Sequence, residues 1–204
     1  MIVTIHQPNF IPWYPFFQKM EQADLFILLG HCQFEKNGFQ NRFQLENIWN
    51  TLSVKKGKES IIKKQYINPE HDWMKIKKRL FKYKDILNEL DPFIDKNLYK
   101  TNRDIIIYLK NKLNIKTPII EDTPTNLVST ERLLMLCKQH GATKYLAGQG
   151  GKDYLDESLF LNEGIKVIYQ ENYNIITNFI KIYGGRARHI NEVSIEEQKD
   201  LGLL

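Results

Sequence analysis

The chain has 204 residues, of which 42% are hydrophobic and 26% are charged. A chain of this length can bury roughly 70% of its unfolded surface, and the composition excludes disordered, collagen-like and coiled-coil proteins. The longest apolar runs, residues 25–29 and 105–109, are far shorter than the roughly 20 residues of a membrane-spanning helix. The amino terminus lacks the pattern of a secretory leader and only two cysteines are present, so we expect a cytoplasmic protein without a membrane span.

The net charge of +5 is unevenly distributed along the chain. Residues 55–84 contain eleven lysines or arginines against three acidic residues. This concentration favours an anionic partner, such as a nucleotide, a carrier protein or RNA. A solvated helix surface is the alternative interpretation, because lysines are common on exposed helix faces.

The first thirty residues predict a strand, a helix and a second strand. Residues 2–5 are β-branched and apolar, and His6, Gln7 and Pro8 end this run, which is typical of a strand entering a rigid loop. Apolar residues at helical spacing predict a helix over 13–23, and the continuous apolar run 25–29 predicts a buried strand. The three elements form a right-handed βαβ unit.

The middle of the chain predicts a longer series of elements. We expect residues 40–42 in a loop or short helix, and strands at 51–54, 60–67 and 118–120. Amphipathic stripes predict helices over 71–87, 101–113 and 129–140, the last capped by Ser129 and ended by Gly141.

A second βαβ unit is predicted near the carboxyl terminus. It comprises a strand at 144–147, a loop at 148–151, a helix at 153–161 and a strand at 165–169. The sequence therefore predicts a single α/β domain over residues 1–175, with a mixed, mainly parallel sheet flanked by helices. Residues 176–204 are expected to form a peripheral extension.

His6 and Gln7 follow directly after the first predicted strand. Open α/β sheets bind ligands beyond the carboxyl ends of their strands, so both residues are candidates for a site. An imidazole near its ordinary pKa of about 6.5 can exchange a proton at neutral pH. The amide of Gln7 can hold a ligand amide or carboxylate. The alternative for His6 is a strand-end histidine that only hydrogen-bonds the backbone.

A second group of candidates follows the second predicted strand. Gln33 comes first, and the adjacent pair Asn41 and Arg42 offers an amide and a forked guanidinium to carboxylate or phosphate oxygens. Cys32 is next to His31, but neighbouring strand residues point to opposite faces, which argues against a thiol–imidazole pair. We therefore expect Cys32 to be dispensable.

The third group is the glycine-rich turn over residues 148–151. Backbone N–H groups between a strand and a helix attract phosphate, carboxylate or an oxyanion, and Lys152 adds a positive charge. Gly148 and Gly150 would supply this backbone, although such turns also occur for purely steric reasons. The segment matches neither GxGxxG nor GxxxxGK[ST], and the sequence contains no recognisable metal-binding or Ser-His-Asp motif.

Several of these segments together resemble one known family. They are residues 5–13 (IHQPNFIPW), the pair 33–34 (QF), residues 40–42 (QNR), residues 146–148 (LAG) and residues 154–156 (YLD). The chain resembles the WbqC-like family of bacterial proteins, whose genes frequently accompany those for O-antigen and other surface polysaccharides. The family has been suggested to include glycine transferases. Its members often carry an acidic residue where this chain has His31 and Cys32.

The resemblance implies an aminoacyl, most simply glycyl, N-transferase that acts on a nucleotide-linked amino sugar. His6 would be the general base, and Asn41, Arg42 or the Gly148 turn would hold the oxyanion. Arg42 and Lys152 would bind the diphosphate. The resemblance also places four further residues at the substrate: Gln7, Gln33, Gly150 and Tyr154.

The resemblance implies no firm cofactor, and the activated glycine donor is left open. Glycine can arrive as a carrier-protein thioester, as glycyl-tRNA, or as free glycine with ATP. Two other functions stay open. One is an ATP-dependent adenylate-forming ligase or nucleotidyltransferase, by analogy of fold only. The other is a non-catalytic protein that binds a sugar nucleotide or a carrier protein.

Overall fold

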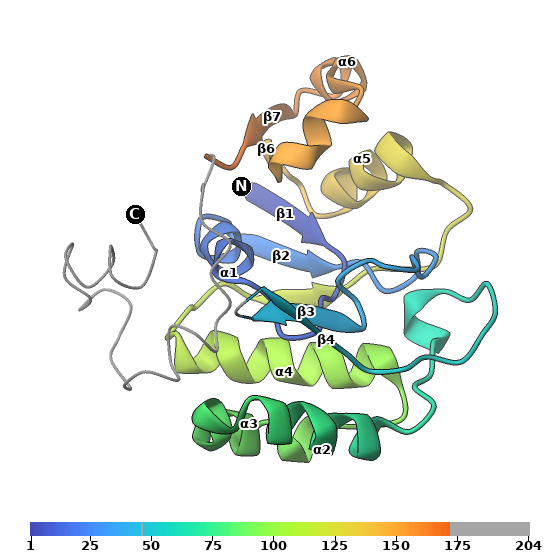
Figure 1. Ribbon diagram of the computed structural model, residues 1–204. Helices are drawn as coiled ribbons and strands as arrows, with labels where there is room; N and C mark the ends of the chain where they lie inside the picture. The colour runs from blue at the N-terminus through green and yellow to red at the C-terminus, as the bar shows by residue number, and fades with distance from the viewer. Residues whose placement is uncertain (46, 172–204) are drawn as a thin grey trace.

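The central feature of the fold is a parallel sheet in the order β5-β2-β1-β6-β7 (Figure 1). The computed structural model describes residues 1–45 and 47–171. All four strand pairings within this sheet are parallel, which fits a sheet with covered faces. The strands are β1 (Ile2–His6), β2 (Leu25–Leu28), β5 (Ile119–Glu121), β6 (Lys144–Ala147) and β7 (Lys166–Tyr169).

Helices cover both faces of the sheet. They are α1 (Tyr14–Glu21), α2 (Pro69–Arg79), α3 (Lys84–Glu89), α4 (Leu98–Lys112), α5 (Ser129–Gln139) and α6 (Glu157–Asn162). One core lies between the sheet and α1 to α4, and the other lies between the sheet and α5 and α6. Figure 1 shows α4, α2 and α3 stacked below the sheet and α5 and α6 at the opposite end.

The strand β2 shows why the sheet needs two covered faces. Phe26 and Leu28 belong to the first core, whereas Leu25 and Ile27 belong to the second. Successive strand residues point to opposite faces, so a continuous apolar run is buried only when helices cover both. The same alternation places Val3 and Ile5 of β1 in the second core.

A small hairpin projects from the connection between β2 and α2. Its antiparallel strands are β3 (Arg42–Leu45) and β4 (Ile48–Thr51). Short 3-10 helices complete the described chain: η1 (Ile61–Lys63), η2 (Phe81–Tyr83), η3 (Asp91–Phe93) and η4 (Gln149–Asp153).

The α/β fold class predicted from the sequence is confirmed. The strands predicted over 2–5, 25–29, 144–147 and 165–169 are present within one residue at each end. The helix over 129–140 ends as expected, because Gly141 follows it with φ of +64°. The boundary predicted near residue 175 and the extension 176–204 lie outside the described residues.

Several local predictions are wrong. The strand expected over 51–54 does not extend beyond Thr51, the last residue of β4, and the helix expected over 153–161 starts only at Glu157. Residues 60–67 contain η1 in place of a strand, and residue 42 begins β3. The helix predicted over 71–87 is broken at Leu80, where a 3-10 turn re-aims the chain so that Tyr83 and Leu87 stay buried. Val128, not Ser129, occupies the N-cap position of α5, and no side chain caps this end.

Candidate functional site

The strand order determines where a ligand can bind. From β1 the sheet continues to β2 on one side and to β6 on the other, so the order reverses between β1 and β6. Doubly wound sheets form their binding crevice beyond the carboxyl ends of the strands at this point. A cavity of about 320 Å³ lies there. Its lining residues are Ile5, His6, Gln7, Lys19, Leu29, Leu133, Tyr145, Gly148, Gly150, Gly151 and Tyr154.

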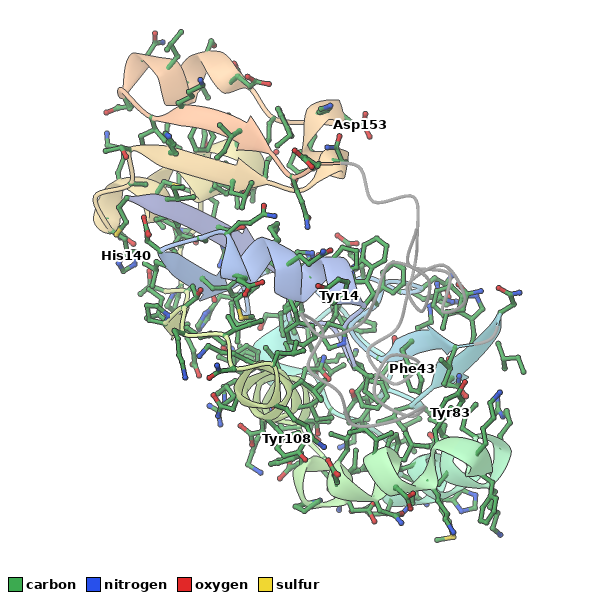
Figure 2. All side chains as sticks on the ribbon, turned by 90° about the vertical axis from the view of Figure 1, so that its left-hand side faces the viewer. Tyr14, Phe43, Tyr83, Tyr108, His140 and Asp153 are labelled. Atoms are coloured by element: carbon green, nitrogen blue, oxygen red, sulfur yellow. The ribbon has the colours of Figure 1, made fainter. Side chains whose placement is uncertain are left out.

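Residues labelled in Figure 2 mark the two ends of the parallel strands. Tyr14, at the start of α1, and Asp153, in η4, lie toward the carboxyl ends of the strands, and His140 lies toward their amino ends. The cavity lies between the end of β1, Lys19 of α1 and the turn that follows β6. Segments more than 100 residues apart in the sequence form its walls.

His6 is the last residue of β1 and lines the cavity. Its Nδ1 lies 2.8 Å from the carbonyl oxygen of Gln7, so Nδ1–H donates and Nε2 keeps its lone pair. Burial, followed by the positive charge of Lys19, lowers the pKa of His6 to about 3. The expectation of a pKa near 6.5 is therefore wrong, and the ring is neutral over the physiological range.

Lys19 also lines the cavity, and the sequence analysis missed it. It lies on α1, its exposed fraction is only 3%, and its Nζ donates to the carbonyl oxygen of Ile5 at 3.2 Å. Burial lowers the pKa of Lys19 to about 7. The sequence could have indicated this burial, because the lysine lies on the apolar stripe of the helix, beside Phe16 and Met20.

The glycine-rich turn forms the wall of the cavity next to β6. A Cβ atom on Gly151 would lie 2.9 Å from Leu155 Cδ1 and 3.3 Å from Ala147 Cβ, so a larger residue at this buried position would force the Leu155 side chain to move. Around Gly148 and Gly150 the space for a Cβ is open, and both line the cavity. The turn thus presents backbone to the cavity without covering side chains.

Other predicted residues of this region lie at or near the cavity. Gln7 and Tyr154 line it, and the side chain of Gln7 accepts a hydrogen bond from Gln40 Nε2. Lys152 is exposed, is not among the lining residues, and its Nζ lies 5.2 Å from the centre of the Tyr169 ring.

The structure does not bring Asn41, Arg42 or Gln33 to the cavity lining. Asn41 is buried and its Nδ2 donates to the carbonyl oxygen of Leu52 at 2.8 Å. Arg42 donates to the carbonyl oxygens of Gly38 and Asn37, and its guanidinium carbon lies 4.0 Å from the centre of the Trp49 ring. Both side chains therefore bind backbone carbonyl groups of the segments that flank the hairpin. Gln33 is exposed and pairs as an isolated bridge with Ser60.

A second polar cluster joins the ends of β2 and β5, and the sequence analysis missed it. Asp122 is fully buried and accepts hydrogen bonds from Gly30 N at 2.7 Å, from His31 N and Nδ1, and from Arg132 Nη2. Arg132 also donates to the carbonyl oxygen of His31 at 3.3 Å. These donors fix the chain after β2.

The two cysteines are thiols in this environment. Cys32 Sγ donates to the carbonyl oxygen of Leu29 at 3.3 Å, and burial raises the pKa of Cys32 to about 11. Burial likewise raises the pKa of Cys137 to about 12. A thiolate nucleophile is therefore disfavoured at either position.

Fold and site define the class: a doubly wound α/β protein with a ligand cavity at the topological switch point. Comparison with known proteins then identifies the family. The WbqC-like protein family matches residues 7–195, so the chain belongs to this family.

One curated protein is similar to this chain over most of its length. The chain is 27% identical over 202 residues to "Uncharacterized protein Rv1507c" of Mycobacterium tuberculosis, covering 90% of this chain and 87% of that protein. No solved structure matches the chain.

Two features are absent from the described residues. None of their helices is both long and apolar enough to cross a membrane. Within the same part of the chain, no group of three or more His, Cys, Asp or Glu side chains is placed to hold a metal ion.

Proposed function

We propose that this protein transfers an aminoacyl group, glycyl in the simplest case, to the amine of a nucleotide-linked amino sugar. The observation that carries the proposal is the cavity between β1 and β6, where a neutral His6 faces a glycine-rich turn. Its volume of about 320 Å³ lies in the range of small-ligand sites, which is about 300–1,000 Å³. Membership of the WbqC-like family supports a role in bacterial surface-polysaccharide assembly, in the cytoplasm.

The chemistry requires three groups. The amine nitrogen of the sugar attacks the glycyl carbonyl carbon, and a C–N bond forms. His6 Nε2, which keeps its lone pair, accepts the proton that the amine loses. N–H groups of the turn over residues 148–151 hold the oxyanion, and its collapse breaks the bond to the leaving group. The leaving group then receives the proton from His6.

The donor remains one of three: a glycyl thioester on a carrier protein, glycyl-tRNA, or glycine with ATP. The basic segment 55–84 suits the first two, because both carriers are acidic. Lys75, Lys78 and Arg79 of α2 are exposed, as a docking surface for such a carrier requires.

The test is a turnover assay with each donor in turn and a set of nucleotide-linked amino sugars. Mass spectrometry of the sugar nucleotide should show the addition of one glycyl group with one of the donors. The His6→Asn variant is the matched control and should lose most of this product. If no donor gives the adduct in the presence of the wild-type chain, the proposed reaction is wrong.

One observation favours a second candidate, an ATP-using ligase or nucleotidyltransferase. The strand order around β1 is that of doubly wound nucleotide-binding sheets, with a histidine at the end of β1. This support is an analogy of fold only. Release of pyrophosphate from ATP in the same assay separates this candidate from donor-dependent transfer. Binding of the sugar nucleotide without any turnover would instead indicate a non-catalytic binding protein.

A further inference from the structure

Two lysines of the described chain are almost completely buried, and they differ in their partners. Lys64, which is 1% exposed, donates to the carbonyl oxygen of Gly57 at 2.9 Å and forms an ion pair with Glu59 at 3.5 Å. Lys19, which is 3% exposed, has only the carbonyl oxygen of Ile5, and no ion pair within the described residues includes it. The first lysine therefore has a structural explanation, whereas the second has no counter-charge within residues 1–45 and 47–171.

No described residue that lines the cavity around Lys19 carries a carboxylate. The titratable groups that line the same cavity are His6 of β1, Tyr145 of β6 and Tyr154 after η4. Glu35 acts electrostatically on Tyr154, but it is not among the lining residues. A buried ammonium without an anion is unfavourable, and it offers three N–H donors of which one is used. An anionic ligand in the cavity would supply hydrogen-bond acceptors for the unused N–H groups of Lys19 and a negative counter-charge.

We propose that Lys19 Nζ binds a phosphate oxygen of the ligand in this cavity, next to the turn over residues 148–151, whose N–H groups the proposed reaction uses for the oxyanion. The inference rests on the proposed function in one respect, since it assigns the diphosphate of that substrate to this cavity. Arg42 and Lys152, the residues expected to bind phosphate, do not line the cavity.

Three features favour phosphate over a carboxylate. The site lies at the switch point of a parallel sheet, where such folds bind the phosphates of nucleotides. The open space around Gly148 and Gly150 lets a group as large as phosphate approach the backbone. Lysine, as a point charge with rotatable donors, is an ordinary ligand for phosphate. The ligand class is therefore a diphosphate, as in a nucleoside diphosphate.

The experiment measures binding of inorganic pyrophosphate and of uridine diphosphate by calorimetry at low salt, with glycine as a carboxylate control. Both phosphates should bind to the wild-type chain, and Lys19→Met should weaken binding at least tenfold. Lys144→Met removes the same charge at the exposed amino end of β6 and should leave binding unchanged. A requirement for uridine diphosphate would show that the nucleoside contributes.

A second measurement needs no variant. Because burial holds the pKa of free Lys19 near 7, ligand binding at pH 8 should take up about one proton. Calorimetry in buffers of different ionisation enthalpy reports this uptake. The affinity should also fall about tenfold per pH unit above pH 7. Lys19→Arg, whose charge does not titrate, should abolish this pH dependence while it keeps binding.

Each outcome decides the inference independently of catalysis. The inference would be overturned if neither phosphate bound, if binding took up no proton, or if Lys19→Met bound phosphate as tightly as the wild-type chain. It would also be overturned if glycine bound and the two phosphates did not. If affinity instead rose with pH through 7, Lys19 would act as a base and not as an anchor. Phosphate binding that depends on Lys19, without any glycyl transfer, would support the phosphate site and refute the proposed reaction. Glycyl transfer without Lys19-dependent phosphate binding would support the reaction and refute the phosphate site.

Discussion

Replacing Lys19 with methionine should increase the stability of the folded protein, because it removes a buried and unpaired charge. Burial lowers the pKa of Lys19 from 10.5 to about 7, and at about 1.4 kcal/mol per pKa unit this shift corresponds to a penalty of about 5 kcal/mol. Methionine keeps most of the side-chain volume but loses the hydrogen bond to Ile5, which costs about 1 kcal/mol. The upper limit of the gain is thus about 4 kcal/mol.

The pH dependence follows from proton binding by the two states. Between pH 7 and pH 10.5 the unfolded chain holds a proton on Lys19 that the folded chain has released, so wild-type stability rises with pH in this window. The full penalty is present below pH 7 and has disappeared above pH 10.5. The stability difference between Lys19→Met and wild type should therefore be largest at pH 6 and should shrink steadily toward pH 10.

Urea unfolding followed by circular dichroism, at several pH values between 6 and 10, measures this difference. The exposed Lys144, replaced by methionine, serves as the control and should change stability by less than about 0.5 kcal/mol. If Lys19→Met were no more stable than wild type at pH 6, or if its advantage were the same at pH 10, Lys19 would not be a buried, destabilising charge. The same variant should lose phosphate binding, so stability and function would oppose each other at this residue.

Three further predictions concern the polar residues around the strand ends. His6→Asn should lower kcat of the proposed transfer by roughly 10²- to 10⁴-fold with little change in affinity. Since the pKa of His6 is about 3, the variant should keep the shape of the pH–rate profile between pH 5 and 9. Loss of an acidic limb in the variant would refute the low pKa of His6. Asp122→Asn should lower the unfolding free energy by about 3–5 kcal/mol in urea titrations, because Arg132 would be left buried without its counter-charge; a loss below about 1 kcal/mol would contradict the cluster's structural role. Cys32→Ser should leave turnover within about threefold, and inactivation that parallels iodoacetamide labelling of this thiol would count against that expectation.

The sequence was sufficient where local pattern alone sets the structure. The apolar runs 2–5 and 25–29 were predicted as buried strands, because a segment that is apolar on both faces has few other stable positions in a small α/β protein. The ends of these runs also placed His6 at a strand terminus correctly. Local pattern failed at Leu80, because a helical stripe does not show that the chain bends within it.

Local pattern also predicted some residues of the candidate site correctly and others wrongly. His6, Gln7 and Gly148 were predicted because they follow strands directly, and the structure places all three at one cavity. Asn41 and Arg42 looked available in the sequence, yet backbone carbonyl groups of the hairpin region occupy their donors. The partner of Asn41 lies 11 residues away and those of Arg42 lie four and five residues away, and a sequence pattern does not show that the chain folds back onto these side chains.

Only the tertiary structure decided which strands are neighbours and which charges are buried. β1 and β6 are adjacent although more than 130 residues separate them, and their pairing creates the cavity. Lys19 became a functional candidate only when the fold enclosed it, because the pKa of an amine depends on its solvation and its neighbours and not on its position in the chain. The same holds for Asp122 and Arg132, which meet His31 through the pairing of β2 with β5. The sequence by itself determined the strands and their polar ends, and tertiary contacts determined the chemistry of the groups between them.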